Sequence, residues 1–172
     1  MNFLDKIRIP NTKVPFSKAL LHAVQIAGIG IWLGVVSKLL DIYTSNLGNI
    51  FSQMSVWIFI CTVISVWSST PCRAAVNVFS FCIGMLTAYY ITAEVTASVY
   101  SIRFLYGWAG LAFVSPSLGF CVWYTKGRRR LSKIIVAGII SVMLTIAVIL
   151  FDKIRVADII FALLTAFVLR KK

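Results

Sequence analysis

Three carboxylates stand where long apolar segments of the chain begin or end. The 172 residues include only 5 Asp and Glu against 17 Lys and Arg. Asp41, Glu94 and Asp158 lie at such boundaries, with basic residues nearby. In a membrane, a charged side chain costs about 2.5 to 3.5 kcal/mol unless it is paired or hydrated. Carboxylates in these positions mark a candidate binding site for a small polar or zwitterionic molecule.

Aromatic and basic residues extend this candidate site. Tyr89 and Tyr90 precede Glu94, and Tyr106 and Trp108 lie early in the next apolar segment. Such residues can wall a pocket, but Trp, Tyr and charged side chains at helix ends also serve as interfacial anchors and surface ion pairs. Both interpretations stay open. The candidate substrate-binding residues, called the outer cluster below, are Lys38, Asp41, Tyr89, Tyr90, Glu94, Arg103, Tyr106, Trp108, Arg155 and Asp158.

A second pattern consists of small residues in the first apolar segment. They recur every three or four positions and therefore share one face of a helix, and the last two form a GxxxG step that allows close backbone approach. This face predicts either helix packing within the monomer or a contact with a partner protein. Its members are Ala19, Ala23, Ala27, Gly30 and Gly34.

The elements that carry these residues are predicted to be membrane helices. Hydrophobic residues make up 60% of the chain, and the mean hydropathy is +0.93. A hydrocarbon core about 30 Å thick takes roughly 20 apolar residues per helix, and helices satisfy their own backbone groups. We expect an all-α bundle of six transmembrane helices. The predicted spans lie near 18–40, 50–68, 74–93, 102–125, 134–151 and 154–169.

Positive charge predicts the orientation of these helices. Under six spans, 13 of the 17 Lys and Arg residues fall on the side that holds both termini, and Lys and Arg resist translocation. Both termini are therefore expected in the cytoplasm, in the cytoplasmic membrane of a bacterium. Residues 1–172 form a single transmembrane domain, and residues 1–16 begin with a short amphipathic segment on the cytoplasmic leaflet. The Asp152-Lys153 connection predicts a tight final hairpin.

The net charge of +12 does not indicate a nucleic-acid partner. The basic residues flank the spans instead of forming a groove interleaved with exposed aromatic side chains. Membrane lipid is the expected partner of these charges. The four cysteines show no CxxC spacing and are expected to be free thiols.

One set of residues could support catalysis. His22, the only histidine, would share the cytoplasmic leaflet with Cys72 and Cys121, and a Cys and His pair can act as nucleophile and base. A membrane peptidase is therefore a third hypothesis. The chain has no HExxH, no GxSxG and no phosphate-binding glycine loop. A half-buried interfacial histidine beside inert thiols explains the same residues, so binding is favoured over catalysis, with no cofactor or metal.

The first helix also carries a family resemblance. Its Ala19-Leu-Leu-His-Ala23 and Ala23-Val-Gln-Ile-Ala27 spacing, with six spans and cytoplasmic termini, resembles the substrate-binding S components of energy-coupling-factor vitamin transporters. In that family an alanine-spaced motif meets the coupling subunit. The chain is also similar to small six-helix bacterial membrane proteins of unknown function, in stretches such as 34–41 and 84–90.

These observations lead to two principal hypotheses. The first is binding or transport of a small polar solute, with the outer cluster as the binding end and the small-residue face as a packing or coupling surface. The alternative is a non-catalytic membrane partner, such as an immunity, assembly or regulatory subunit, which could also form a homo-oligomer through the first helix. A bound metabolite supports the first hypothesis, whereas a co-purifying subunit without one supports the second.

Overall fold

The protein is a bundle of helices. The computed structural model describes residues 7–11, 15–44, 48, 50–51, 53–127 and 130–170, without the side chains of 103–104, 130–131 and 150–151. This part of the chain contains helices and no strands, which confirms the predicted all-α class. The elements are α1 (Phe16–Tyr43), α3 (Met54–Trp67), α4 (Pro71–Val95), α5 (Ile102–Trp123), the 3-10 turn η1 (Tyr124–Lys126), α6 (Arg130–Phe151) and α7 (Val156–Arg170).

Four of these helices are long and apolar enough to cross a membrane. They are Phe16–Tyr43, Pro71–Val95, Leu105–Lys126 and Ser132–Ile149. The α3 and α7 helices, with 14 and 15 residues, reach only about 21 to 23 Å at 1.5 Å per residue, which is less than the hydrocarbon thickness. All six predicted ranges overlap observed helices, while six complete spans and cytoplasmic termini remain predictions.

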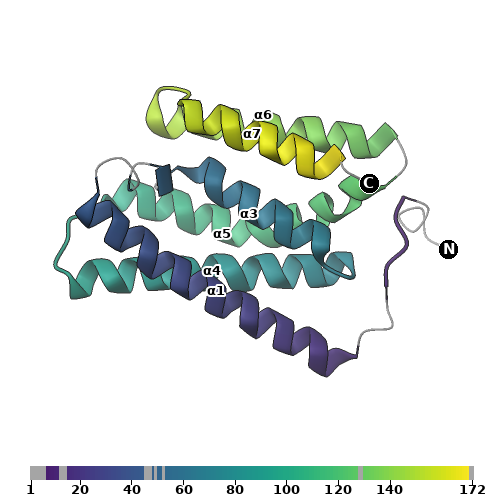
Figure 1. The fold of residues 1–172 in the computed structure, drawn as a ribbon, viewed down its shortest axis with the longest axis horizontal. Helices are drawn as coiled ribbons and strands as arrows, with labels where there is room; N and C mark the ends of the chain where they lie inside the picture. Colours follow the sequence, from purple (N-terminus) through teal and green to yellow (C-terminus); the bar gives the residue numbers. More distant parts are fainter. Residues whose placement is uncertain are drawn as a thin grey trace.

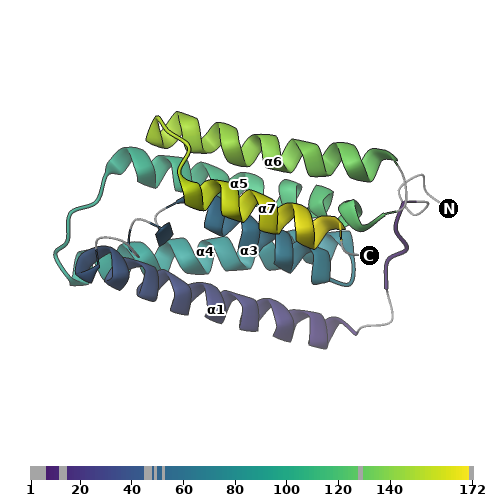
Figure 2. The same ribbon diagram turned by 45° about the horizontal axis from the view of Figure 1, so that its top comes forward.

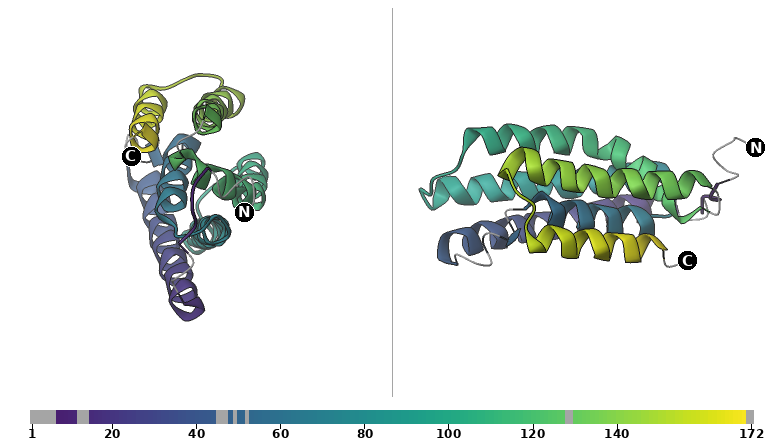
Figure 3. Two further views of the ribbon diagram at one scale, coloured as in Figure 1. Left: turned by 90° about the vertical axis from the view of Figure 1, so that its right-hand side faces the viewer. Right: turned by 90° about the horizontal axis from the view of Figure 1, so that it is seen from above.

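The short α3 helix lies in the middle of the bundle. It contacts α4 and α5 on one side and the α6–α7 hairpin on the other, while α1 packs on α4 (Figures 1 and 2). The end-on view shows α1 and the hairpin on opposite sides of this centre (Figure 3). Seven buried residues of α3, including Ser55, Thr62 and Ser65, reflect this central position.

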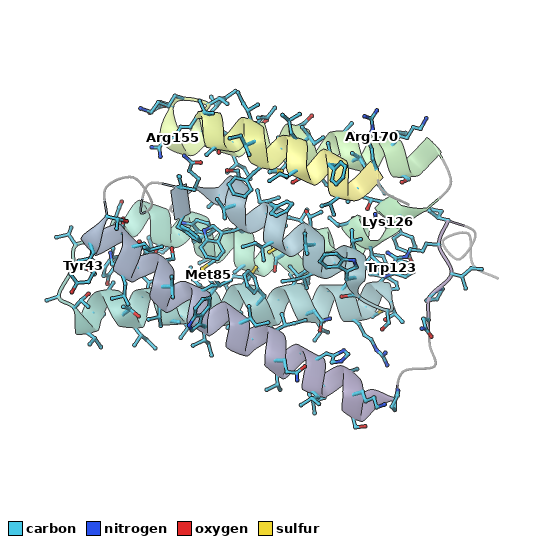
Figure 4. All side chains as sticks on the ribbon, viewed as in Figure 1. Tyr43, Met85, Trp123, Lys126, Arg155 and Arg170 are labelled. Atoms are coloured by element: carbon cyan, nitrogen blue, oxygen red, sulfur yellow. The ribbon has the colours of Figure 1, made fainter. Side chains whose placement is uncertain are left out.

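The alternating helix directions divide the loops between two ends. Tyr43 and Arg155 lie at one end, and Trp123, Lys126 and Arg170 lie at the other (Figure 4). We call the first the Asp41 end; it comprises residues 41–44, 95–102 and 151–156. The second, the Arg8 end, comprises residues 7–11, 66–71, 123–127 and 168–170.

Glycines allow α1 and α4 to approach closely. A Cβ added to Gly30 would lie 2.5 Å from the Phe81 carbonyl oxygen, and one at Gly84 would lie 2.7 Å from that of Ala27. A Cβ at Gly34 would also collide with the backbone of α4. Small residues bring membrane helices into backbone contact in this way. The GxxxG step therefore packs within the monomer.

The proline inside α5 is accommodated by its neighbour. Pro116 has no N–H with which to bond the carbonyl of Ala112, four residues earlier. The Ser115 hydroxyl donates to that carbonyl oxygen at 2.8 Å. An unsatisfied carbonyl in lipid would cost several kcal/mol, so this hydroxyl helps α5 to continue from Ile102 to Trp123 without interruption.

The sequence predicts a short amphipathic segment at the N-terminus, and its residues 7–11 and 15–16 belong to the described part of the chain. Within its described part, residues 7–11 are not helical, and Ile7 is buried against Ala74, Trp123 and Tyr124. The segment thus packs against the start of α4 and the end of α5 at the Arg8 end. Residues 1–6 and 12–14 lie outside the described part of the chain.

Candidate functional site

A cavity of about 330 Å³ opens at the Asp41 end. Its wall is formed by α1, α3, α4, the 96–101 loop and α5, and Met85 lies at its inner side in the centre of the bundle (Figure 4). We call it the outer pocket. It is lined by Ser37, Asp41, Phe51, Trp57, Met85, Leu86, Tyr89, Tyr90, Val99, Tyr100, Ser101 and Trp108.

The polar centre of the outer pocket is Asp41. Its Oδ2 accepts from Lys38 Nζ at 3.0 Å and from the Tyr89 hydroxyl at 3.1 Å. Lys38 is only 1% exposed, whereas the Asp41 side chain is 34% exposed. Both bonds fall on Oδ2, and no donor among the described residues reaches Oδ1. One carboxylate oxygen is therefore left for a ligand.

The buried ammonium of Lys38 has two further contacts. It donates to the Val99 carbonyl oxygen at 3.4 Å and lies 5.1 Å from the centre of the Tyr89 ring. An aromatic face attracts a cation through its quadrupole. Lys38 is thus fixed by α1, α4 and the 96–101 loop together.

A chain of tyrosines connects Asp41 to Glu94 at the rim. The rings of Tyr89 and Tyr90 are 5.2 Å apart, as are those of Tyr90 and Tyr100, and both pairs meet edge to face. The Tyr100 hydroxyl donates to Glu94 Oε1 at 2.5 Å. This bond and the charge of Glu94 raise the pKa of Tyr100, because both favour the neutral phenol.

The structure divides the outer cluster. Asp41, Tyr89, Tyr90 and Trp108 line the pocket, and Lys38 and Glu94 join it through hydrogen bonds. Tyr106 is 73% exposed and is not among the lining residues. The side chain of Arg103 lies outside the described residues.

Asp158 and Arg155 belong to a different place, the start of α7. Asp158 is 3% exposed, and its carboxylate accepts from the Ser55 hydroxyl at 2.5 Å and from the Arg155 backbone N–H at 2.9 Å. Acceptors in the first turn satisfy the free N–H groups of a helix and favour its dipole. Asp158 therefore fastens α7 to α3.

The sequence alone did not identify several of the residues that line the outer pocket. Tyr100 and Ser101 directly precede the expected fourth helix, and a search for polar loop residues beside the outer cluster could have found them. Trp57, Met85 and Leu86 carry no such signal, since apolar residues in membrane helices face lipid, a neighbouring helix or a cavity alike. The residues missed were Ser37, Phe51, Trp57, Met85, Leu86, Val99, Tyr100 and Ser101.

A second cavity, the inner cavity, has a volume of about 250 Å³ and lies between α3, α4, α5 and α6. Cys61 and Cys82 line it, with their sulfur atoms 3.6 Å apart as free thiols. Most of its wall is aliphatic or aromatic. Its lining includes Trp57, Met85, Leu86, Trp108, Ser65, Ser115, Leu118, Val122, Gly138 and Ile139.

The remaining sequence candidates fall elsewhere. On the small-residue face, Ala23, Gly30 and Gly34 are buried, while Ala19 and Ala27 are half-buried. His22, Cys72 and Cys121 are exposed in the isolated chain, and among the described residues no hydrogen bond joins the histidine to either thiol. In the same part of the chain, no group of three His, Cys, Asp or Glu side chains is placed to hold a metal.

Comparisons with protein-family models, curated protein sequences and solved structures each gave no match.

Proposed function

We propose that this protein is a small membrane protein that binds a polar solute bearing a positively charged group, with the outer pocket as its site. The observation that carries the proposal is the lining of that pocket. Asp41 offers an acceptor at Oδ1, because its two hydrogen bonds fall on Oδ2. Six aromatic residues line the same pocket: Phe51, Trp57, Tyr89, Tyr90, Tyr100 and Trp108.

Aromatic walls and a carboxylate favour a cation over an anion. Quaternary ammonium groups are bound by aromatic cages because several ring faces replace part of the lost hydration. The described lining includes no Lys or Arg, and Lys38 already illustrates the attraction, with its ammonium near the face of Tyr89.

In the proposed topology, the protein crosses the membrane six times and both termini lie in the cytoplasm. The clustering of Lys and Arg near one end supports this orientation, and it would make the outer pocket face away from the cytoplasm. In that orientation the pocket supports solute capture for uptake, as in the S components that the first helix resembles.

Choline and its neutral isostere 3,3-dimethyl-1-butanol test the proposal. We expect the full-length protein in lipid nanodiscs to bind choline at least tenfold more tightly than the uncharged alcohol. Tyr90→Leu should weaken choline binding about tenfold, because a desolvated cation–π contact is worth up to about 2 kcal/mol. Tyr90→Phe keeps the ring and should stay within about twofold of the wild type.

Two results would contradict the proposed site. One is equal binding of choline and the alcohol, which would remove any role for charge. The other is equal loss in the Leu and Phe variants, which would assign the effect to the hydroxyl or to folding. Circular dichroism of each variant provides the folding control.

A further inference from the structure

The outer pocket and the inner cavity meet at four side chains. Trp57, Met85, Leu86 and Trp108 line both. The two tryptophan rings lie edge to face with centres 6.3 Å apart, and the Trp57 indole N–H donates to the Phe51 carbonyl at 2.8 Å. Met85 is unbranched and adapts its shape readily. A ligand in the outer pocket is thus separated from the apolar inner cavity by these four side chains.

The inner cavity is long and narrow. Its lining on α5 extends from Trp108 to Val122, which is about 21 Å at 1.5 Å per residue. A volume of about 250 Å³ spread over this length suits an extended chain better than a compact ring system.

Two of the three hydroxyls that line the inner cavity, those of Ser65 and Ser115, already donate to backbone carbonyls. Ser65 donates to the Cys61 carbonyl at 2.7 Å, and Ser115 donates to that of Ala112 at 2.8 Å. Neither hydroxyl has a second proton to offer a ligand. A polar ligand would lose hydrogen bonds to water there and form few new ones. A hydrocarbon, in contrast, would be stabilised by the removal of its apolar surface from water.

We infer that the ligand is amphipathic, with an ammonium head in the outer pocket and one hydrocarbon chain in the inner cavity. This inference rests on the proposed function, since it assigns the head to the same site. The position of the two cavities carries it: a charged, aromatic-walled compartment adjoins an apolar one, and four shared side chains form the partition between them. Because the two tryptophan rings are in edge-to-face contact, the chain enters where the flexible side chain of Met85 turns aside, and it then extends along α5 towards Val122.

Gly138 offers a way to fill the inner cavity without disturbing the fold. It lines the cavity, and a Cβ added there would meet nothing within 4 Å. Gly138→Phe should therefore occupy space reserved for the chain. Gly28→Phe is the matched control, because Gly28 on α1 also has open space around it and is not among the residues lining either cavity.

The measurement is the affinity of an alkyltrimethylammonium series, from tetramethylammonium to the decyl compound, for the protein in nanodiscs. In the wild type and in Gly28→Phe, affinity should rise up to about fourfold per methylene, the factor expected for a buried CH₂. In Gly138→Phe, the decyl compound should bind at least tenfold more weakly than in the wild type. Tetramethylammonium binding should stay within twofold.

The outcomes separate the inference from the proposed function. If tetramethylammonium binds and chain length has the same effect in all three proteins, the chain lies in the bilayer and the inference is overturned, while the proposed function stands. If neither tetramethylammonium nor its longer analogues bind, both are overturned. Loss of tetramethylammonium binding in Gly138→Phe alone would also contradict separate head and chain compartments.

A photolabel gives a second measurement that needs no variant. A hexadecyltrimethylammonium with a diazirine at the end of its chain is long enough to reach the deep part of the inner cavity, and it should label Leu118, Val122 or Ile139, which line that part. Labelling confined to exposed residues such as Phe113 and Val114 would show that the chain lies in lipid and would overturn the inference.

Discussion

The two ends of the bundle use their charged residues in opposite ways. At the Arg8 end, Arg8 donates to the carbonyl oxygens of Val66 at 3.0 Å and Trp123 at 2.8 Å. Lys126 similarly donates to Val168 at 2.6 Å. These carbonyls lie in or beside the last turns of α3, α5 and α7, where helices leave acceptors free and favour cations.

At the Asp41 end, carboxylates accept hydrogen bonds mainly from side-chain hydroxyls. Tyr89 donates to Asp41, Tyr100 to Glu94 and Ser55 to Asp158. At the Arg8 end, cations are fixed to backbone carbonyls, whereas Asp41 keeps one oxygen that no donor among the described residues reaches. A charged side chain therefore indicates a binding site only when the fold leaves one of its hydrogen-bonding atoms without a protein partner.

The largest expected change in the free energy of unfolding comes from removing the guanidinium of Arg8, which binds the carbonyl oxygens of two helix ends. Arg8→Ala should lower the free energy of unfolding by about 4 kcal/mol, because each charge-assisted hydrogen bond contributes about 1.5 to 3 kcal/mol. The lost stacking on Trp123, whose ring centre lies 4.1 Å from the guanidinium carbon, adds to this. Titration with sodium dodecyl sulfate in mixed micelles measures the change.

Arg8→Lys is the control for this prediction. It keeps the charge but cannot span two carbonyls with a planar fork, so about half of the loss should return. An unchanged free energy of unfolding in Arg8→Ala would mean that the Arg8 guanidinium does not stabilise this end of the bundle. It would contradict the difference proposed between the two ends.

A smaller and asymmetric effect is expected at Asp41 and Lys38. Asp41→Ala leaves the buried Lys38 ammonium without its counter-charge and should cost about 2 kcal/mol, below the 3 to 5 kcal/mol typical of fully buried pairs. Lys38→Met places an apolar chain in the buried position and leaves Asp41 at the surface, so it should cost less than about 1 kcal/mol. The same unfolding titration measures both.

The double variant sharpens this second prediction. Lys38→Met with Asp41→Ala should be more stable than Asp41→Ala alone, since no buried charge remains. Equal losses in the two single variants would show that the pair acts as an ordinary exposed ion pair.

The smallest effect is a pH dependence at the rim of the pocket. Glu94 raises the pKa of Tyr100, so the neutral phenol is favoured in the folded protein. Its contribution to stability is complete below the ordinary tyrosine pKa of about 10 and is lost as the pH rises through the higher folded value. The phenolate absorbance that disappears in Tyr100→Phe should therefore titrate above about pH 10.

Glu94→Gln tests the cause of this shift. Without the carboxylate, the Tyr100 component should titrate at a lower pH than in the wild-type protein. An unchanged titration would show that Glu94 does not influence Tyr100 in solution, and would remove Glu94 from the pocket.

The helices could be predicted because the residues that determine where a helix begins and ends lie at those ends. Thr70 accepts from the backbone N–H of Arg73 at 3.2 Å, and Pro71 begins α4, as expected for a helix start with a capping hydroxyl and a proline. The turn after α6 includes Asp152 in the left-handed region, with φ of 54°. Such signals lie within a few residues of the boundary that they determine.

The candidate site could be predicted only in part because its contacts are distant in sequence. Asp158 three residues after Arg155 fits a side-chain ion pair or a helix cap, and the hydroxyl of Ser55, 103 residues away, could not be anticipated. Likewise, Arg8 resembled any basic residue before a membrane helix. Asp41 and Tyr89 were found because each stands at the end of its own helix.

The glycines between α1 and α4 also restrict how the protein can move. Gly30 and Gly34 hold the backbone of α4 against that of α1, so a shift of one residue would drive the side chain of Ile31 or Leu33 into a carbonyl. Packed helices change register in whole turns, not by gradual sliding. These two helices therefore form one rigid unit, and a change in the width of the outer pocket would come from the rest of its wall, which is α3, the 96–101 loop and α5.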